Sequence, residues 1–253
     1  MPRKPRQESI ASIHHVINRG TSQQIIYETD EDRAYFMSRL NHIISQHEGH
    51  LFAWCLMGNH FHLLLQCPIN VLSVVMHDLQ TSYSGYFNRT YGRNGTLFGG
   101  RFKNEPINTD EYLMTVVRYI HENPLKAGLS DDLHYTWSSY DAYIGKRHND
   151  DIDFVLKVFG GLQQFIDFHT QSHKGEACID IENEKLRKYS DSEAIQIIQR
   201  ISCREDIASI KSCDKETRDA IVLGLKQHGL GSRQIQRLTG ISMGLITKIR
   251  CVQ

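Results

Sequence analysis

Two histidines, His60 and His62, flank Phe61 in an apolar run that predicts a β-strand. Because successive strand side chains point to opposite faces, the two imidazoles share one face while Phe61 can enter the core. Two neutral imidazoles side by side form a half-site for a divalent metal ion. Two ordinary strand histidines are the competing interpretation of this tripeptide.

Two cysteines near the tripeptide allow a different kind of metal site. Cys55 and Cys67 complete the pattern Cys-x4-His-x-His-x4-Cys, which could hold structural zinc. If Gly58 and Asn59 form a hairpin turn, Cys55 lies across from His62, but Cys67 falls at the far end of its strand. We therefore do not expect the four side chains to converge, and a zinc-stabilised structural protein is the least favoured hypothesis.

A predicted helix over residues 110–123 carries a second reactive group. Tyr119 and Asn123 are four residues apart and lie on one face near the helix end, which Glu122 could also reach. A phenol there could act as a nucleophile, and the amide oxygen could bind the same metal. The alternative is that Tyr119 only packs in the core.

A basic stretch over residues 79–104 contains no acidic residue and six aromatic ones. Exposed aromatic rings stack on unpaired bases, and basic side chains contact phosphates. We expect at least half of these rings to be core residues. The phosphate-contact candidates are Arg89, Arg93, Arg101 and Lys103.

The last 34 residues, 220–253, have five basic side chains and no acidic one. Apolar residues around Gly240 follow the spacing of a helix-turn-helix, although Gln236 replaces the small residue that is usual in its first helix. The DNA-contact candidates in this segment are Arg233, Ser242 and Lys248. A helical bundle for protein contacts is the alternative.

The composition suits a folded α+β protein of one or two domains. The chain has 253 residues, 29 basic and 29 acidic side chains and 40% hydrophobic residues, which excludes a mainly disordered chain. No apolar run approaches the ~20 residues of a membrane-spanning helix, and residues 1–7 do not resemble a secretory signal, so we expect a cytoplasmic protein without membrane contact. The six scattered cysteines predict reduced thiols.

Hydrophobic periodicity and turn residues predict the elements that position these groups. The predicted strands are 13–18, 51–57 and 60–66, and the predicted helices are 31–47, 71–91 and 110–123. Thr109 can cap the last of these helices, and Pro124 is expected to end it. We predict a first domain at 1–147, a connector with a short helix at 148–189, and a helical helix-turn-helix domain at 190–253.

Two motifs resemble those of a known family. Residues 57–65 (MGNHFHLLL) resemble the HUH motif, which is His, a bulky hydrophobic residue and His. Residues 118–129 (RYIHENPLKAGL), followed by 135–140 (YTWSSY), resemble the tyrosine segment of the REP-associated tyrosine transposases. These are relatives of the single-tyrosine HUH transposases of bacterial insertion sequences. The resemblance covers roughly residues 10–145 and departs from the pattern at Gly58, where many relatives have proline.

The resemblance implies a ferredoxin-like βαββαβ core with the two histidines on a central strand. It assigns the nucleophile to Tyr119, the metal ligands to His60 and His62, and the completing amide to Asn123. The implied ion is Mg²⁺ or Mn²⁺, and we find no glycine loop for a nucleotide cofactor.

The implied activity is metal-dependent nicking and strand transfer of single-stranded or hairpin DNA through a 5′-phosphotyrosine. The protein would act as a monomer or homodimer. The alternative is a catalytically inactive, transposase-derived regulator that binds DNA.

Overall fold

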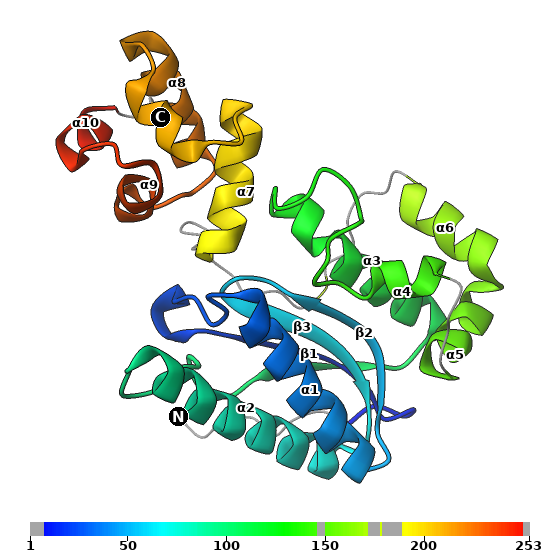
Figure 1. The fold of residues 1–253 in the computed structure, drawn as a ribbon. Helices are drawn as coiled ribbons and strands as arrows, with labels where there is room; N and C mark the ends of the chain where they lie inside the picture. The colour runs from blue at the N-terminus through cyan, green and yellow to red at the C-terminus, as the bar shows by residue number, and fades with distance from the viewer. Residues whose placement is uncertain (1–7, 146–149, 172–177, 179–188, 250–253) are drawn as a thin grey trace.

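A computed structural model describes residues 8–145, 150–171, 178 and 189–249. Its centre is a four-stranded antiparallel sheet in the order β2-β3-β1-β4 (Figure 1). The strands are β1 (Ile13–Arg19), β2 (His50–Leu56), β3 (His60–Gln66) and β4 (Lys103–Ile107). Helix α1 (Asp30–Gln46) joins β1 to β2, and α2 (Ile69–Tyr91) joins β3 to β4. This order confirms the expected α+β class and the ferredoxin-like βαββαβ core.

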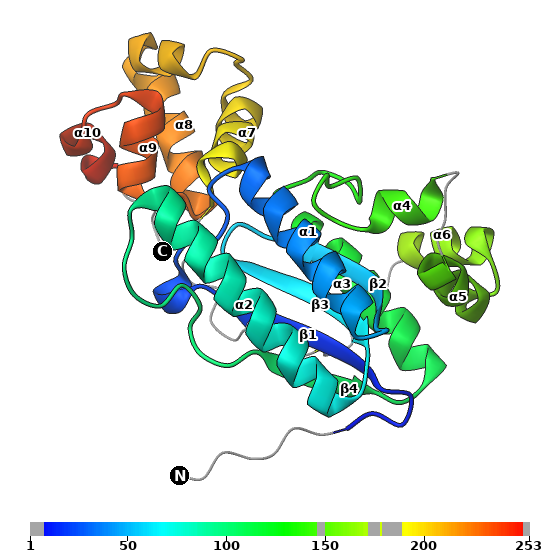
Figure 2. The same cartoon turned by 60° about the horizontal axis from the view of Figure 1, so that its bottom comes forward.

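The two faces of the sheet are covered by different helices. Helices α1 and α2 lie side by side over one face, and α3 (Asp110–Lys126) packs on the other (Figures 1 and 2). Along β3, Phe61 and Leu63 belong to the apolar cluster under α1 and α2, whereas Leu64 belongs to the cluster under α3. The two-residue period of a strand therefore directs His60 and His62 toward α3.

Helix α3 begins as expected, because the Thr109 side chain accepts a hydrogen bond from the Tyr112 backbone N–H. The prediction that Pro124 ends it at Asn123 is wrong, since the helix continues to Lys126. A proline in the last turn removes only one backbone donor, and the turn closes through the Ala127 N–H, which bonds the Asn123 carbonyl at 2.9 Å. The extra residues place Lys126 on the same helix as the tyrosine.

Three short helices extend the α3 side of the sheet. They are α4 (Tyr140–Ile144), α5 (Asp150–Phe159) and α6 (Leu162–Thr170). The expected connector helix is thus two helices, separated by Gly160 and Gly161, whose positive φ angles of 86° and 122° favour glycine. Val155 and Phe165 are fully buried in the apolar cluster that also contains the inner face of α3, so residues 150–170 add to the core.

The C-terminal part is helical, as expected. It contains α7 (Asp191–Ser202), α8 (Lys215–Gln227), α9 (Ser232–Thr239) and α10 (Met243–Lys248), and a 3₁₀ turn, η2 (Ile207–Ser212), follows α7. A second 3₁₀ turn, η1 (Thr21–Gln23), follows β1. Gly240 ends α9 with φ of 70°, and Ile235, Ile241 and Ile246 are buried around the α9–α10 turn.

The apolar cluster of these C-terminal helices is continuous with that of α3. The predicted boundary at 147/148 lies outside the described residues, and the boundary at 189/190 falls at the start of α7. Helix α10 ends before Arg250, which also lies outside the described part of the chain. None of the described helices combines the length and hydrophobicity needed to cross a bilayer.

Candidate active site

The tertiary structure brings Tyr119 of α3 against the histidines of the sheet. The ring centroids of Tyr119 and His62 are 5.6 Å apart, with the rings nearly perpendicular at 76°. A third histidine, His15 of β1, lies 5.8 Å from the Tyr119 ring and stacks on His62 at 5.3 Å. The candidate nucleophile and one candidate metal ligand are therefore neighbours, as the sequence predicted.

The β1–β3 register explains how His15 reaches His62. His15 pairs with Leu64, and Ile17 pairs with His62, so the two histidines are diagonal neighbours on one face of the sheet. His15 Nε2 and His62 Nδ1 are 3.1 Å apart and share a hydrogen bond. Both side chains are fully buried. This contact fixes the plane of the His62 ring and leaves its Nε2 for another partner.

His60 begins β3 and is only partly buried. Its ring centroid lies 5.2 Å from that of His62, which confirms that the two imidazoles share a face. His60 Nδ1 lies 2.7 Å from the Asn59 Oδ1, so Nδ1 donates this hydrogen bond. The proton on Nδ1 makes Nε2 the nitrogen with a lone pair.

The electrostatics of the site favour neutral imidazole. Burial lowers the pKa of His62 well below its ordinary value, and the neighbouring His60 and His15 lower it further. The His62 Nε2 atom is buried and makes no hydrogen bond to any described residue. A buried polar atom without a partner costs about 1–3 kcal/mol, so a ligand that bound His62 Nε2 would remove this cost.

Helix α3 carries further polar groups near Tyr119. Asn123 donates its amide to the Tyr119 carbonyl at 2.9 Å, which leaves the Asn123 Oδ1 as an oxygen ligand. This contact confirms that the two residues share the end of the helix, but it does not join Asn123 to the histidines. Lys126 lies over the Tyr119 ring at 5.1 Å and pairs with Glu122 at 2.8 Å. His121 points away from Tyr119, toward His169.

The zinc hypothesis fails on geometry. Cys55 is buried on the α3 side of the sheet, whereas Cys67 is buried on the α1–α2 side. Burial also raises the pKa of both thiols, that of Cys67 to about 11, which disfavours the thiolate that zinc requires. No group of three or more His, Cys, Asp or Glu side chains within the described residues could by itself hold a metal.

Four of the six aromatic rings in the stretch 79–104 are buried, which confirms that at least half of them belong to the core. Its four buried rings lie in the cluster under α1 and α2 and are Tyr83, Phe87, Phe98 and Phe102. Arg89, Arg101 and Lys103 are exposed, the last on the edge strand β4. Arg93 is exposed too, but it contacts the Gln24 side chain and lies 5.5 Å from the Phe87 ring.

The remaining DNA-contact candidates lie in the C-terminal helices. Ser242 caps α10, and both Ser242 and Lys248 are exposed. Arg233 is in α9, and its side chain lies outside the described part of the structure. These residues are on elements separate from the Tyr119 site.

Sequence reasoning missed two residues of the site, His15 and Lys126. The signal for His15 was present, because it lies in the predicted strand 13–18, but a lone strand histidine does not reveal its partner. Lys126 was placed beyond the helix end by the misjudged Pro124.

Comparison with known proteins finds a family match for part of the chain. Residues 9–123 match the model of the family described as "Transposase IS200 like". A solved structure of the REP-associated tyrosine transposase bound to a REP hairpin is similar, with a TM-score of 0.50 and 14% identity, covering 71% of this chain and all of that one.

Another solved structure, provisionally assigned as a transposase of Deinococcus radiodurans, has a TM-score of 0.34 and 18% identity. It covers 47% of this chain and 95% of that one. No curated protein matches.

The fold and the site define a ferredoxin-like α+β domain in which a His-x-His strand faces a tyrosine on a helix. Over residues 9–123, the sequence of this domain matches the IS200-like transposases. This match supports DNA binding and DNA processing of the transposition type.

Proposed function

We propose that this protein nicks single-stranded DNA at hairpin-forming repeats and transfers the strand through a covalent 5′-phosphotyrosine on Tyr119. The observation that carries the proposal is the contact of the Tyr119 ring with His62, whose buried Nε2 has no partner among the described residues. Phosphoryl transfer to a tyrosine with the help of a metal ion needs a phenol close to side chains that can bind the ion. Tyr119 and His62 have this arrangement.

The residues of the site fit a divalent ion such as Mg²⁺ or Mn²⁺. His60 and His62 each have Nδ1 engaged by a protein group, Asn59 and His15 respectively, so Nε2 would be the ligand nitrogen of each ring. The Asn123 Oδ1 would be the oxygen ligand, and a mixed nitrogen and oxygen set suits Mn²⁺. When bound, the ion would stabilise the charge that develops on the scissile phosphate.

Tyr119 would lose its phenolic proton and attack the phosphorus, forming a Tyr–O–P bond. The bond from phosphorus to the 3′-oxygen would break, and that oxygen would take up a proton to become a 3′-hydroxyl. A second 3′-hydroxyl could reverse the exchange, so no energy-rich cofactor is required. The Tyr119 hydroxyl is shielded from solvent, which protects the phosphotyrosine from water. Lys126, over the ring and partly exposed, is placed to contact the phosphate.

The exposed Arg89, Arg101 and Lys103 would contact the DNA backbone. The similar solved structure holds a REP hairpin, which supports a hairpin as the substrate class. We further propose that Arg233, Ser242 and Lys248 of the C-terminal helices add contacts through a helix-turn-helix. The free cysteines suit action in the cytoplasm.

The test is incubation with hairpin oligonucleotides and Mn²⁺, followed by denaturing electrophoresis. A covalent protein–DNA band that EDTA prevents supports the proposal. Hairpin binding without an adduct, under any divalent metal, favours the inactive DNA-binding regulator instead.

A further inference from the structure

Glu193, at the start of helix α7, is a buried carboxylate that joins the C-terminal helices to the catalytic domain. Its Oε2 accepts hydrogen bonds from the Ser190 backbone N–H and hydroxyl, both at 2.8 Å, and the Ser190 hydroxyl accepts from the Glu193 N–H. This reciprocal arrangement is a capping box. Its two residues are 0% and 3% exposed, whereas a helix cap ordinarily lies at the surface.

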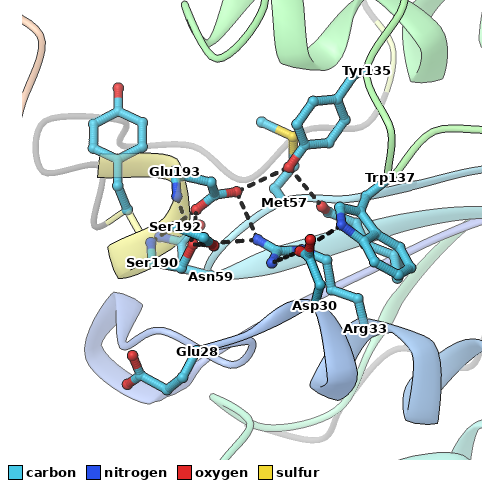
Figure 3. A network of polar contacts seen from close by, with 12 residues as sticks. Glu28, Asp30, Arg33, Met57, Asn59, Tyr135, Trp137, Ser190, Ser192 and Glu193 are labelled. Atoms are coloured by element: carbon cyan, nitrogen blue, oxygen red, sulfur yellow. Dashed lines mark hydrogen bonds and ion pairs between the residues drawn. The ribbon is translucent and has the colours of Figure 1, made fainter. Parts of the chain in front are cut away.

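The other carboxylate oxygen is bound by the catalytic domain. Glu193 Oε1 accepts from Arg33 of α1 at 2.9 Å and from the Tyr135 hydroxyl at 3.0 Å (Figure 3). The Arg33 side chain is 1% exposed, and its other guanidinium nitrogen contacts Asp30 at 3.3 Å. A buried charge pair of this kind is costly to break, because one charge would remain unpaired.

The same carboxylate lies against the turn that leads to the His-x-His strand. A Cβ atom added to Gly58 would lie 2.2 Å from Glu193 Oε2 and 3.0 Å from the Ser190 nitrogen. No side chain fits there while α7 is docked. The docking of α7 therefore explains why this position holds glycine.

The turn is also held from its other side. The Gly58 carbonyl accepts from the Ile26 N–H at 2.9 Å, and the Asn59 carbonyl accepts from the Gly20 N–H at 2.9 Å. The Asn59 side chain then bonds His60 Nδ1. A continuous path of contacts thus runs from Glu193 through the turn to His60.

We infer that Glu193 is a positioning residue for His60, and that helix α7 belongs functionally to the catalytic domain. The inference rests on the proposed function in so far as His60 binds a metal. The turn at Gly58 and Asn59 lies between the loop after β1 and the Glu193 carboxylate. These two contacts fix the position of the turn, and the turn fixes the start of β3. Displacing the carboxylate would move Asn59 and with it the His60 ring.

The experiment is a double-mutant cycle on the full chain with Gly58→Ala, Glu193→Ala and both together. Positioning is read first without metal, from the ring ¹H–¹⁵N NMR signals of His60. Each single variant should shift these signals, because Gly58→Ala pushes the turn away from the carboxylate and Glu193→Ala removes the support of the turn. The double variant should shift them by clearly less than the sum of the two single shifts, because both changes act on one contact. Independent, additive shifts would overturn the inference.

Metal affinity is the second measurement, by titration calorimetry with Mn²⁺. Gly58→Ala and Glu193→Ala should each weaken binding on the order of 10-fold, the size typical of groups that orient a metal ligand, and the double variant should be little weaker than either single variant. If the wild type binds no Mn²⁺, the proposed metal chemistry fails while the NMR cycle still decides the positioning role.

Arg200→Ala is the matched control. Arg200 also joins α7 to the catalytic domain, through Asp131 at 2.9 Å and the Gly128 carbonyl, but it does not touch the turn. This variant should leave the His60 signals and the Mn²⁺ affinity unchanged. Arg200→Ala changes equal to those of Glu193→Ala would show that only the docking of α7 matters and would overturn the specific role of Glu193.

Discussion

Two buried pairs of histidines lie at opposite sides of helix α3, and they differ in their hydrogen bonds. His15 and His62 are 3.1 Å apart on the sheet side, and His121 and His169 are 3.0 Å apart on the side of α5 and α6. All four residues are at most 5% exposed, and burial lowers the pKa of His62, His121 and His169. Burial and pKa therefore do not distinguish the pairs.

The hydrogen bonds of the ring nitrogens distinguish the two pairs. His121 Nε2 contacts the Ser139 hydroxyl at 2.8 Å, and His169 Nδ1 donates to the Phe165 carbonyl at 2.8 Å, so all four ring nitrogens of this pair have protein partners. In the other pair, His62 Nε2 makes no hydrogen bond within the described residues. A pair with all its hydrogen bonds made serves the stability of the fold, whereas the other pair leaves one ring nitrogen open to a partner that the described residues do not supply.

The largest effect is expected at Tyr119. Tyr119→Phe removes one oxygen and preserves the ring, so the fold and hairpin binding should survive while the covalent adduct disappears completely. Mass spectrometry of the wild-type adduct should locate the nucleotide on the peptide that contains Tyr119. Attachment at Tyr112 or at a serine would refute the assignment even if the protein nicks DNA.

A slightly smaller loss is expected at His62 of the incomplete pair and at its neighbour His60. His62→Ala or His60→Ala should reduce nicking by about 10²-fold or more, as loss of metal-assisted charge stabilisation does, while hairpin affinity changes only a few fold. Rates in Mn²⁺ and hairpin binding at the same salt concentration check this. A folded variant that loses binding and cleavage together would show that these histidines are not dedicated ligands.

The completed pair should respond in the opposite manner. His121→Ala opens a cavity and strips partners from His169 and Ser139, so the free energy of unfolding should fall by about 2–4 kcal/mol, measured by urea denaturation. Nicking at low temperature should persist. The control is His134→Ala, which removes an exposed hydrogen bond with Asp141 and should change stability by less than about 0.5 kcal/mol.

The completed pair should also make stability depend on pH. Burial lowers the pKa of His169 from 6.5 to about 4, and the pKa of His121 is lowered as well, by burial first and then by His169. Below pH 6.5 these two histidines bind protons in the unfolded chain but not in the folded one. Their contribution to the free energy of unfolding is therefore full above pH 6.5 and is lost as the pH falls toward 4. Urea midpoints between pH 4 and 7 should fall less steeply for His121→Leu combined with His169→Phe than for wild type, and an unchanged slope would contradict the assignment.

The smallest effect is expected at the surface. Arg101→Ala or Lys103→Ala should weaken hairpin binding only a few fold, and each should reduce the slope of log affinity against log salt by about 1, because one basic group no longer neutralises a phosphate. Lys157→Ala on α5, outside the acid-free stretch, serves as a control of equal charge. Equal effects of all three variants would indicate a general charge effect with no specific phosphate site.

Much of the active site follows from the sequence because local rules govern it. Strand alternation alone puts His60 and His62 on one face, and helical periodicity puts Tyr119 and Asn123 on another. The Thr109 cap and the turn at Gly58 and Asn59 follow from side-chain chemistry within four residues. The resemblance of the two motifs to a transposase family added the prediction that these two faces belong to one site, which periodicity alone could not give.

Only the tertiary structure decided which groups complete that site. His15 and His62 are 47 residues apart, and Arg33 and Glu193 are 160 apart, so no local rule could pair them. Cys55 and Cys67 looked equivalent in sequence but lie on opposite faces of the sheet. The physical reason is that propensity, capping and periodicity act over a turn or two of chain, whereas the partner of a buried polar atom is selected by how whole elements pack.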